Sequence, residues 1–195
     1  MRRLIVLLLS VMLLAGCATQ QARVAQRQAV VASMPVLRLP PSALPGTLAL
    51  QQRLAFRRGD RHETVDALVE NDASNTRLVI HAQGQVALRL DWDGRQLTQK
   101  RAPWLPGALD GERVLSDLQL VFWPIGAIAA ALPAGWSLRE ESGRRVLRQG
   151  EAIVATVDYP QPLQARLEQR ALGYTLDIDS SEIDSTESTP TEGTP

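Results

Sequence analysis

The chain has 195 residues, enough for one domain of ordinary size and an extra segment at either end. Its 21 basic and 21 acidic side chains cancel, which argues against a dedicated nucleic-acid binder, because such proteins usually carry a basic excess. Cys17 is the single cysteine and there are two histidines, so we expect no disulfide framework, no metal site and no cofactor.

The N-terminus has the pattern of a bacterial lipoprotein signal. Arg2 and Arg3 precede an apolar run, residues 4–14, which as a helix would span about 17 Å, too short for the ~30 Å hydrocarbon core. The run ends in Leu-Ala-Gly-Cys, which resembles the lipobox. In proteins with a lipobox, the signal is cut between Gly16 and Cys17, and the thiol of Cys17 receives diacylglycerol.

This resemblance implies a signal peptide at 1–16, lipid attachment at Cys17 and the membrane as a partner through the lipid anchor. Ala18 follows the cysteine, instead of the aspartate that retains lipoproteins at the inner membrane of enteric bacteria. We therefore expect the outer membrane, at its periplasmic face. The alternative is a plain signal peptide with an incidental cysteine.

Two polar segments flank the predicted domain, which covers residues 47–179. Residues 17–46 contain the lipidated cysteine and a stretch rich in glutamine, alanine and proline, which predicts a flexible tether. Residues 180–195 contain four acidic side chains, no basic one and a single apolar residue, Ile183. Such a composition predicts a disordered acidic tail.

Alternating apolar and polar residues predict five strands in the first half of the domain. The clearest alternation places Val86, Leu88, Leu90 and Trp92 on one face of a strand. The Asp-Gly pair that follows is typical of a hairpin turn. The five predicted strands are 47–58, 62–70, 76–82, 85–92 and 95–101.

The period then changes to three and four residues, which predicts two helices at 112–123 and 124–132. Asp110 is suited to cap the first helix, and Pro124 interrupts the ladder and is suited to begin the second. Residues 120–132 carry no charge, so this segment is expected to be buried, to face a membrane or to cover a ligand.

Strands resume after Gly135, at 136–140, 144–148, 152–159, 163–170 and 173–179. The predicted fold class is mainly β (α+β): a curled antiparallel sheet, or half-barrel, of about ten strands. The central helical pair is the element available to cover its concave face.

The order of these elements is similar to that of the LolA/LolB-type periplasmic carriers, in which helices cover an acyl-binding hollow in a half-barrel. The segments Leu118-Gln119-Leu120-Val121-Phe122-Trp123-Pro124 and Arg170-Ala171-Leu172-Gly173-Tyr174 more closely resemble a family of uncharacterised outer-membrane lipoproteins. Genes for that family often lie beside aryl-polyene and fatty-acid-like biosynthesis genes. The resemblance implies the half-barrel fold and no catalytic residues.

No nucleophile elbow, phosphate-binding loop or metalloprotease motif occurs in the sequence, so we do not expect an enzyme. We expect instead an outer-membrane lipoprotein that binds or carries a hydrophobic lipid, acyl or polyene product in the half-barrel. The alternative is a non-catalytic accessory lipoprotein of an envelope complex, whose protein partners the sequence does not identify. The predicted ligand-binding residues are Leu88, Leu90, Trp92, Phe122, Trp123, Ile125 and Ile128.

Overall fold

The computed structural model describes residue 28 and residues 34–105 and 110–183. The chain divides into two units, residues 1–35 and 36–195, and the second contains all the strands and helices discussed below. The predicted signal peptide, Gly16, Cys17 and the part of the tail from residue 184 on lie outside the described residues.

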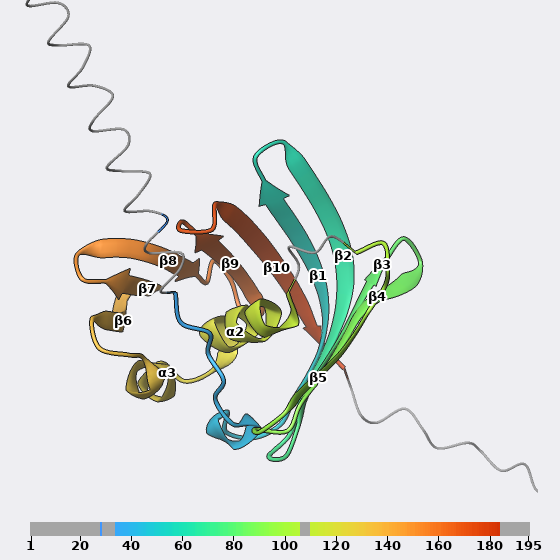
Figure 1. Cartoon of the computed structure of the whole chain (residues 1–195), viewed down its shortest axis with the longest axis horizontal. Coiled ribbons are helices and arrows are strands. Elements are labelled where there is room, and N and C mark those ends of the chain that lie inside the picture. Colours follow the sequence, from blue (N-terminus) through green and yellow to red (C-terminus); the bar gives the residue numbers. More distant parts are fainter. Residues whose placement is uncertain (1–27, 29–33, 106–109, 184–195) are drawn as a thin grey trace, which may run out of the picture. The chain divides into compact units, whose positions relative to one another are not determined.

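The described residues form one antiparallel sheet of ten strands in the order β5-β4-β3-β2-β1-β10-β9-β8-β7-β6, which confirms the predicted architecture (Figure 1). The sheet does not close on itself, since β5 and β6 are its two edges. The strands are β1 (Leu48–Arg58), β2 (Arg61–Asn71), β3 (Thr76–Ala82), β4 (Gln85–Trp92), β5 (Leu97–Arg101), β6 (Trp136–Glu141), β7 (Arg144–Gln149), β8 (Ala152–Asp158), β9 (Gln164–Gln169) and β10 (Tyr174–Glu182).

The strand order explains where the helices lie. The edge strands β5 and β6 are consecutive in the sequence, so the chain between them must cross one face of the sheet. That connection contains α2 (Gly111–Phe122) and α3 (Ile125–Ala131), which lie over the concave face (Figure 1). Asp110 caps α2 as predicted, accepting a hydrogen bond from the Glu112 amide, and Pro124 stands immediately before α3.

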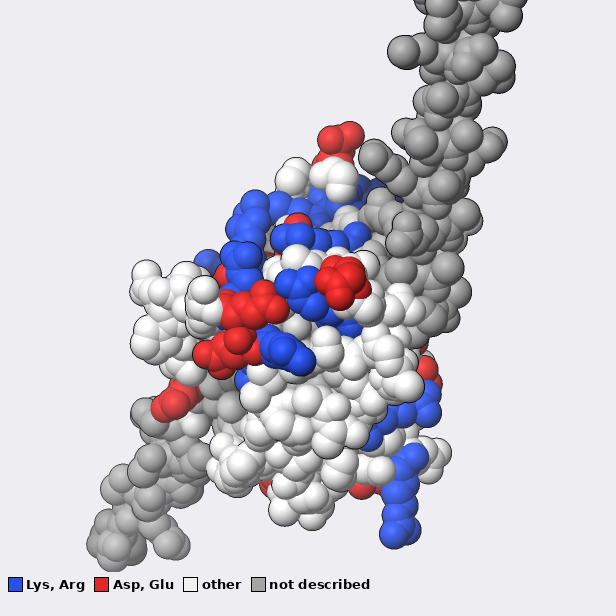
Figure 2. Space-filling model, turned by 90° about the vertical axis from the view of Figure 1, so that its left-hand side faces the viewer, with Lys and Arg blue, Asp and Glu red and all other residues white. Residues whose placement is uncertain are grey.

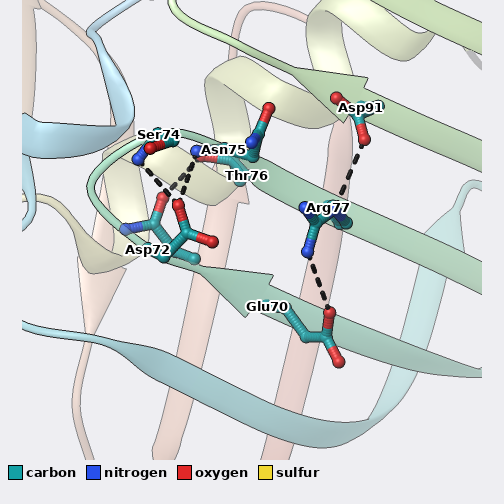
Figure 3. Close-up of polar contacts among 8 residues, drawn as sticks. Glu70, Asp72, Ser74, Asn75, Thr76, Arg77 and Asp91 are labelled. Carbon is teal, nitrogen blue, oxygen red and sulfur yellow. Dashed lines mark hydrogen bonds and ion pairs between the residues drawn. The ribbon is translucent and has the colours of Figure 1, made fainter.

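Short polar turns connect the strands of the hairpins. In the β2–β3 turn, Asp72 Oδ1 accepts hydrogen bonds from the amides of Ser74 and Asn75, at 2.7 and 2.9 Å (Figure 3). Asp93 does the same for Arg95 and Gln96 in the β4–β5 turn. Each aspartate thereby satisfies amides that the ladders leave free, and these hydrogen bonds lower the pKa of both carboxyls.

A segment before β1 packs into this unit, contrary to the prediction of a flexible tether up to residue 46. Residues 36–44, here called the strap, include a short 3-10 helix (Pro41–Ala43). Leu37 and Leu39 are buried, and the Leu37 and Leu39 amides donate to Ser116 Oγ and Gln119 Oε1, both at 3.0 Å. The prolines lack backbone N–H groups, but they do not prevent packing. The strap is held by hydrogen bonds from its two leucine amides to side chains of α2.

The predicted boundary of the acidic tail is also displaced. Residues 180–182 belong to β10 and pair with β1, in register from Leu50 opposite Glu182 to Arg57 opposite Thr175. Gln52 Nε2 donates to Ser180 Oγ at 3.0 Å. Strand pairing satisfies backbone groups whatever the side chains are, so a polar composition did not prevent it.

No helix within the described ranges is long and apolar enough to cross a membrane.

Candidate functional site

A hollow of about 550 Å³ opens beside the C-terminal end of α2, and we call it the apolar hollow. Val121 and Phe122 of α2 form one side of it, and the connection between β8 and β9, residues 159–163, forms the other. Arg145 of β7 and the first two residues of β9 complete the wall. The hollow is shallow and open to solvent, its surface is mostly apolar, and among the described residues that line it Arg145 carries the charge.

Polar groups fix the end of α2 at the edge of the apolar hollow. Arg145 Nη1 donates to the carbonyl oxygens of Leu120 and Val121, at 2.7 and 3.0 Å, and Tyr159 Oη donates to that of Val121 at 2.6 Å. The Arg145 guanidinium lies 5.5 Å from the centre of the Tyr159 ring. A cation at a helix C-terminus also favourably compensates the helix dipole.

The other wall of the apolar hollow is held in an uncommon backbone conformation. Leu163 has a φ of +61°, which a leucine rarely adopts, and its side chain remains 45% exposed. Its carbonyl accepts from the Ser180 amide at 3.0 Å, so pairing with β10 holds the strained residue in place. Strain of this kind costs free energy and is concentrated at functional sites.

The structure places the predicted ligand-binding residues in two environments. Five of them are at most 3% exposed and belong to the packed core: Leu88, Leu90, Trp92, Trp123 and Ile128. Phe122 and Ile125 are half-buried, and Phe122 lines the apolar hollow.

Helix α2 approaches β4 directly where Gly111 lies beside the Leu90 side chain. Helix α3 packs against β6, and α2 packs against β9. The strap also links α2 to β4, because the Trp92 and Trp123 indoles donate to the successive carbonyls of Leu39 and Pro40, at 2.8 and 3.4 Å. Pattern analysis placed the helices over the sheet without anticipating this extra layer.

A second hollow of about 370 Å³ lies at the other end of β9, lined by Arg57, Gly59, Arg170, Gly173 and residues of β9 and β10. Beneath it is a buried network centred on Asp117 of α2. Gln169 Nε2 donates to Asp117 Oδ1 at 2.7 Å, and Tyr174 Oη donates to Asp117 Oδ2. Gln169 Oε1 is buried and has no hydrogen-bond partner among the described residues.

Burial dominates the electrostatics of this network. Desolvation raises the pKa of Asp117 to about 6, against the opposing effect of the hydrogen bonds from Tyr174 and Gln169. The pKa of Tyr174 is raised by burial and by the adjacent Asp117 carboxylate. Tyr174 is the last residue of one segment that carried the family resemblance, and Asp117 immediately precedes Leu118, the first residue of the other. The network therefore links these two parts of the chain.

The face formed by β6, β7 and α3 is divided by charge. Figure 2 shows basic and acidic side chains gathered over its upper part, and a broad area without charge below them. No charged residue occurs from Leu118 to Leu138, and within this stretch Ala129, Ala130 and Ala131 of α3 are exposed. The uncharged segment is thus buried along α2 and partly exposed along α3.

Sequence reasoning missed Arg145, Tyr159 and Leu163, because each falls in a segment that was predicted only as a strand. It also missed Asp117, for which a signal existed. Asp117 falls three residues after Val114 and four before Val121, so it lies within the apolar stripe of α2. Within the described residues, no cluster of side chains suited to a metal ion occurs.

One family model matches the chain, over residues 49–182, and its description is "Protein of unknown function (DUF3261)". No curated protein matches the sequence significantly. The matched range extends from β1 to the last residue of β10 and contains both hollows. Because the match covers well over half of the chain, the protein belongs to the uncharacterised family DUF3261.

Proposed function

We propose that this protein is an outer-membrane lipoprotein, anchored through Cys17, that binds the hydrocarbon chain of an acyl or polyene molecule in the apolar hollow. The observation that carries the proposal is the apolar hollow itself, which Phe122 and Leu163 both line. The lipobox pattern ending in Cys17 supports the anchor. Binding and transfer, rather than catalysis, is the proposed activity.

The energetics favour a chain-like ligand at this position. Each methylene that leaves water contributes about 0.8 kcal/mol, and the apolar hollow offers side chains that are already partly exposed. Between α2 and the sheet, Leu88, Leu90 and Trp123 are at most 1% exposed, so these side chains already have their apolar surface buried. A ligand there would first have to displace the strap, so we assign binding to the apolar hollow.

The similarity in element order to LolA/LolB-type carriers supports a role in moving a lipid or polyene product. One feature argues against insertion of lipoproteins into membranes. LolB-type carriers use an exposed apolar loop between two early strands, whereas the β2–β3 turn here is polar and closed by Asp72 (Figure 3). We therefore propose binding of a free amphiphile rather than of a lipoprotein.

The test uses hexadecanoic acid carrying a photoreactive diazirine, added to the purified full chain in phosphatidylcholine nanodiscs. After illumination, adducts should map to the peptides containing Phe122 and residues 159–165. Leu163→Asp should lower the adduct yield about tenfold, because it places a carboxylate against the hydrocarbon chain. Aspartate tolerates the left-handed backbone conformation, so the fold should be retained.

Leu68→Asp is the matched control, because Leu68 is 39% exposed on β2, away from the apolar hollow. It should leave the adduct yield unchanged. Adducts spread evenly over the surface, or equal yields from the two variants, would exclude a binding site at the apolar hollow.

A second candidate is a structural accessory lipoprotein, which the packed interior favours. In that case the photoreactive probe should give no localised adduct on the wild-type protein, and the chain should co-purify stoichiometrically with an envelope complex.

A further inference from the structure

Among the described residues, Arg145 is the one charged side chain in the wall of the apolar hollow. Val121, Phe122, Leu163 and the two prolines of the β8–β9 connection surround the same space. A guanidinium placed among apolar groups is partly desolvated, and it remains charged because its pKa is too high for deprotonation in proteins. A bound hydrocarbon chain would therefore have a fixed positive charge within reach of one end.

The donors of this guanidinium are only partly used. Nη1 donates to the carbonyls of Leu120 and Val121, which holds the group in position. Nε and Nη2 have no hydrogen-bond partner among the described residues. Glu140 lies opposite Arg145 in the β6–β7 register, but no ion pair within 4.0 Å joins them in the described chain.

The neighbouring arginine, unlike Arg145, has a carboxylate partner. Arg144 precedes Arg145 on β7, and its Nε donates to Asp158 across the β7–β8 ladder. Successive residues of a strand point to opposite faces, so Arg144 is directed away from the apolar hollow. One arginine thus has a carboxylate partner, whereas the other keeps free donors beside an apolar surface.

We propose that the apolar hollow selects amphiphiles with an anionic head group, a carboxylate or a phosphate, which Arg145 binds through Nε and Nη2. This inference rests on the proposed function and adds the class of ligand. The two donors form a planar edge that matches two oxygens of such a group. The hydrocarbon chain then lies along Phe122 and Leu163.

The experiment compares three photoreactive probes of equal chain length: hexadecanoic acid, hexadecyl phosphate and hexadecanol. Each is added to the full chain in phosphatidylcholine nanodiscs at a pH where the carboxylate is ionised. The wild-type protein should give about tenfold more adduct at residues 159–165 with an anionic probe than with the alcohol, as expected for a charge-assisted hydrogen bond. Equal yields from acid and phosphate indicate recognition of charge; a difference between them identifies the preferred head group.

Arg145→Gln should reduce the ratio of anionic to neutral adduct to about one; the readout is the ratio, so a change common to all three probes does not affect it. Arg145→Lys keeps the charge but lacks the planar edge, so it should retain only part of the preference, which keeps the proposal testable if the glutamine variant loosens α2. Arg144→Gln is the matched control and should keep the wild-type ratio.

Equal binding of all three probes by the wild-type protein would overturn the head-group assignment and leave the proposed function standing. Failure of every probe, including hexadecanol, would overturn the proposed function as well.

Discussion

Asp117 is an acidic residue at a buried position, although a carboxylate favours contact with water. It lies on the buried face of α2, and both its oxygens accept hydrogen bonds, from Gln169 and Tyr174. These bonds offset part of the cost of burying a charge and leave a carboxyl whose pKa is about 6. A raised pKa means that the folded protein holds this proton more tightly than the unfolded chain does.

The contribution of Asp117 to stability therefore depends on pH. It is most favourable below about pH 4, the unfolded value, and it decreases as the pH rises to about 6, by about 3 kcal/mol in total. Asp117→Asn preserves the shape, can accept from Gln169 and donate to Tyr174, and should remove this decrease. The measurement is the free energy of urea unfolding of wild type and variant across this pH range.

Asp60→Asn is the control, because Asp60 is exposed in the β1–β2 turn. Its curve should run parallel to that of the wild type. If the Asp117→Asn curve also runs parallel to the wild-type curve, the carboxyl does not titrate as the buried geometry requires.

At the scale of elements, Gln119 holds the strap against α2. Its side chain accepts from the Leu39 amide at 3.0 Å and donates to the Leu39 carbonyl at 2.9 Å, so it pairs with the strap as a neighbouring strand would. Leu37 and Leu39 are buried beside it, whereas Arg38 between them points outward and forms an ion pair with Glu112. This alternation is that of an extended strand, with α2 side chains supplying the hydrogen-bond partners of Leu37 and Leu39.

Gln119→Leu should lower the free energy of unfolding by about 2 kcal/mol, because it leaves the buried Leu39 amide without an acceptor. It should also speed tryptic cleavage after Arg38, since the strap is released more often. Gln51→Leu, at an exposed position of β1, should change neither quantity appreciably. Unchanged cleavage after Arg38 in the Gln119 variant would show that other contacts hold the strap.

At the scale of the whole molecule, the β1–β10 ladder joins the five strands that precede the helices to the five that follow them. The two central strands come from opposite ends of the domain sequence, and eight registered pairs connect them. The apolar hollow depends on this ladder, because the Ser180 amide of β10 holds the carbonyl of Leu163.

Truncation after Asp179 should therefore destabilise the protein, by about 1–3 kcal/mol. It removes the Ser180 partner of Gln52, whose buried amide would lose its acceptor, and three residues paired with β1. Truncation after Ile183 keeps all of β10 and is the matched control. Equal unfolding midpoints for the two truncated chains in urea would show that residues 180–183 add nothing to the ladder.

The strands and helices could be predicted from the sequence because their signals are local. Alternation in β4, the Asp-Gly turn after it and the apolar stripe of α2 each act within a few residues. All ten strands and both helices formed where these patterns indicated them, with boundaries shifted by a few residues. In the observed strand order, the strands before and after the helices, β5 and β6, are the two edges of the sheet. The helices between them therefore have to cross one face of the sheet.

Tertiary structure alone decided the site. Whether residues 36–44 pack depended on Gln119, Trp92 and Trp123, which lie far away in the sequence, and the extension of β10 depended on the unpaired edge of β1. The apolar hollow needed the end of α2, a strand residue and a turn to meet, and none of these signals ligand binding alone. Local periodicity determines secondary structure, whereas a site depends on contacts between distant segments, which a single sequence does not display.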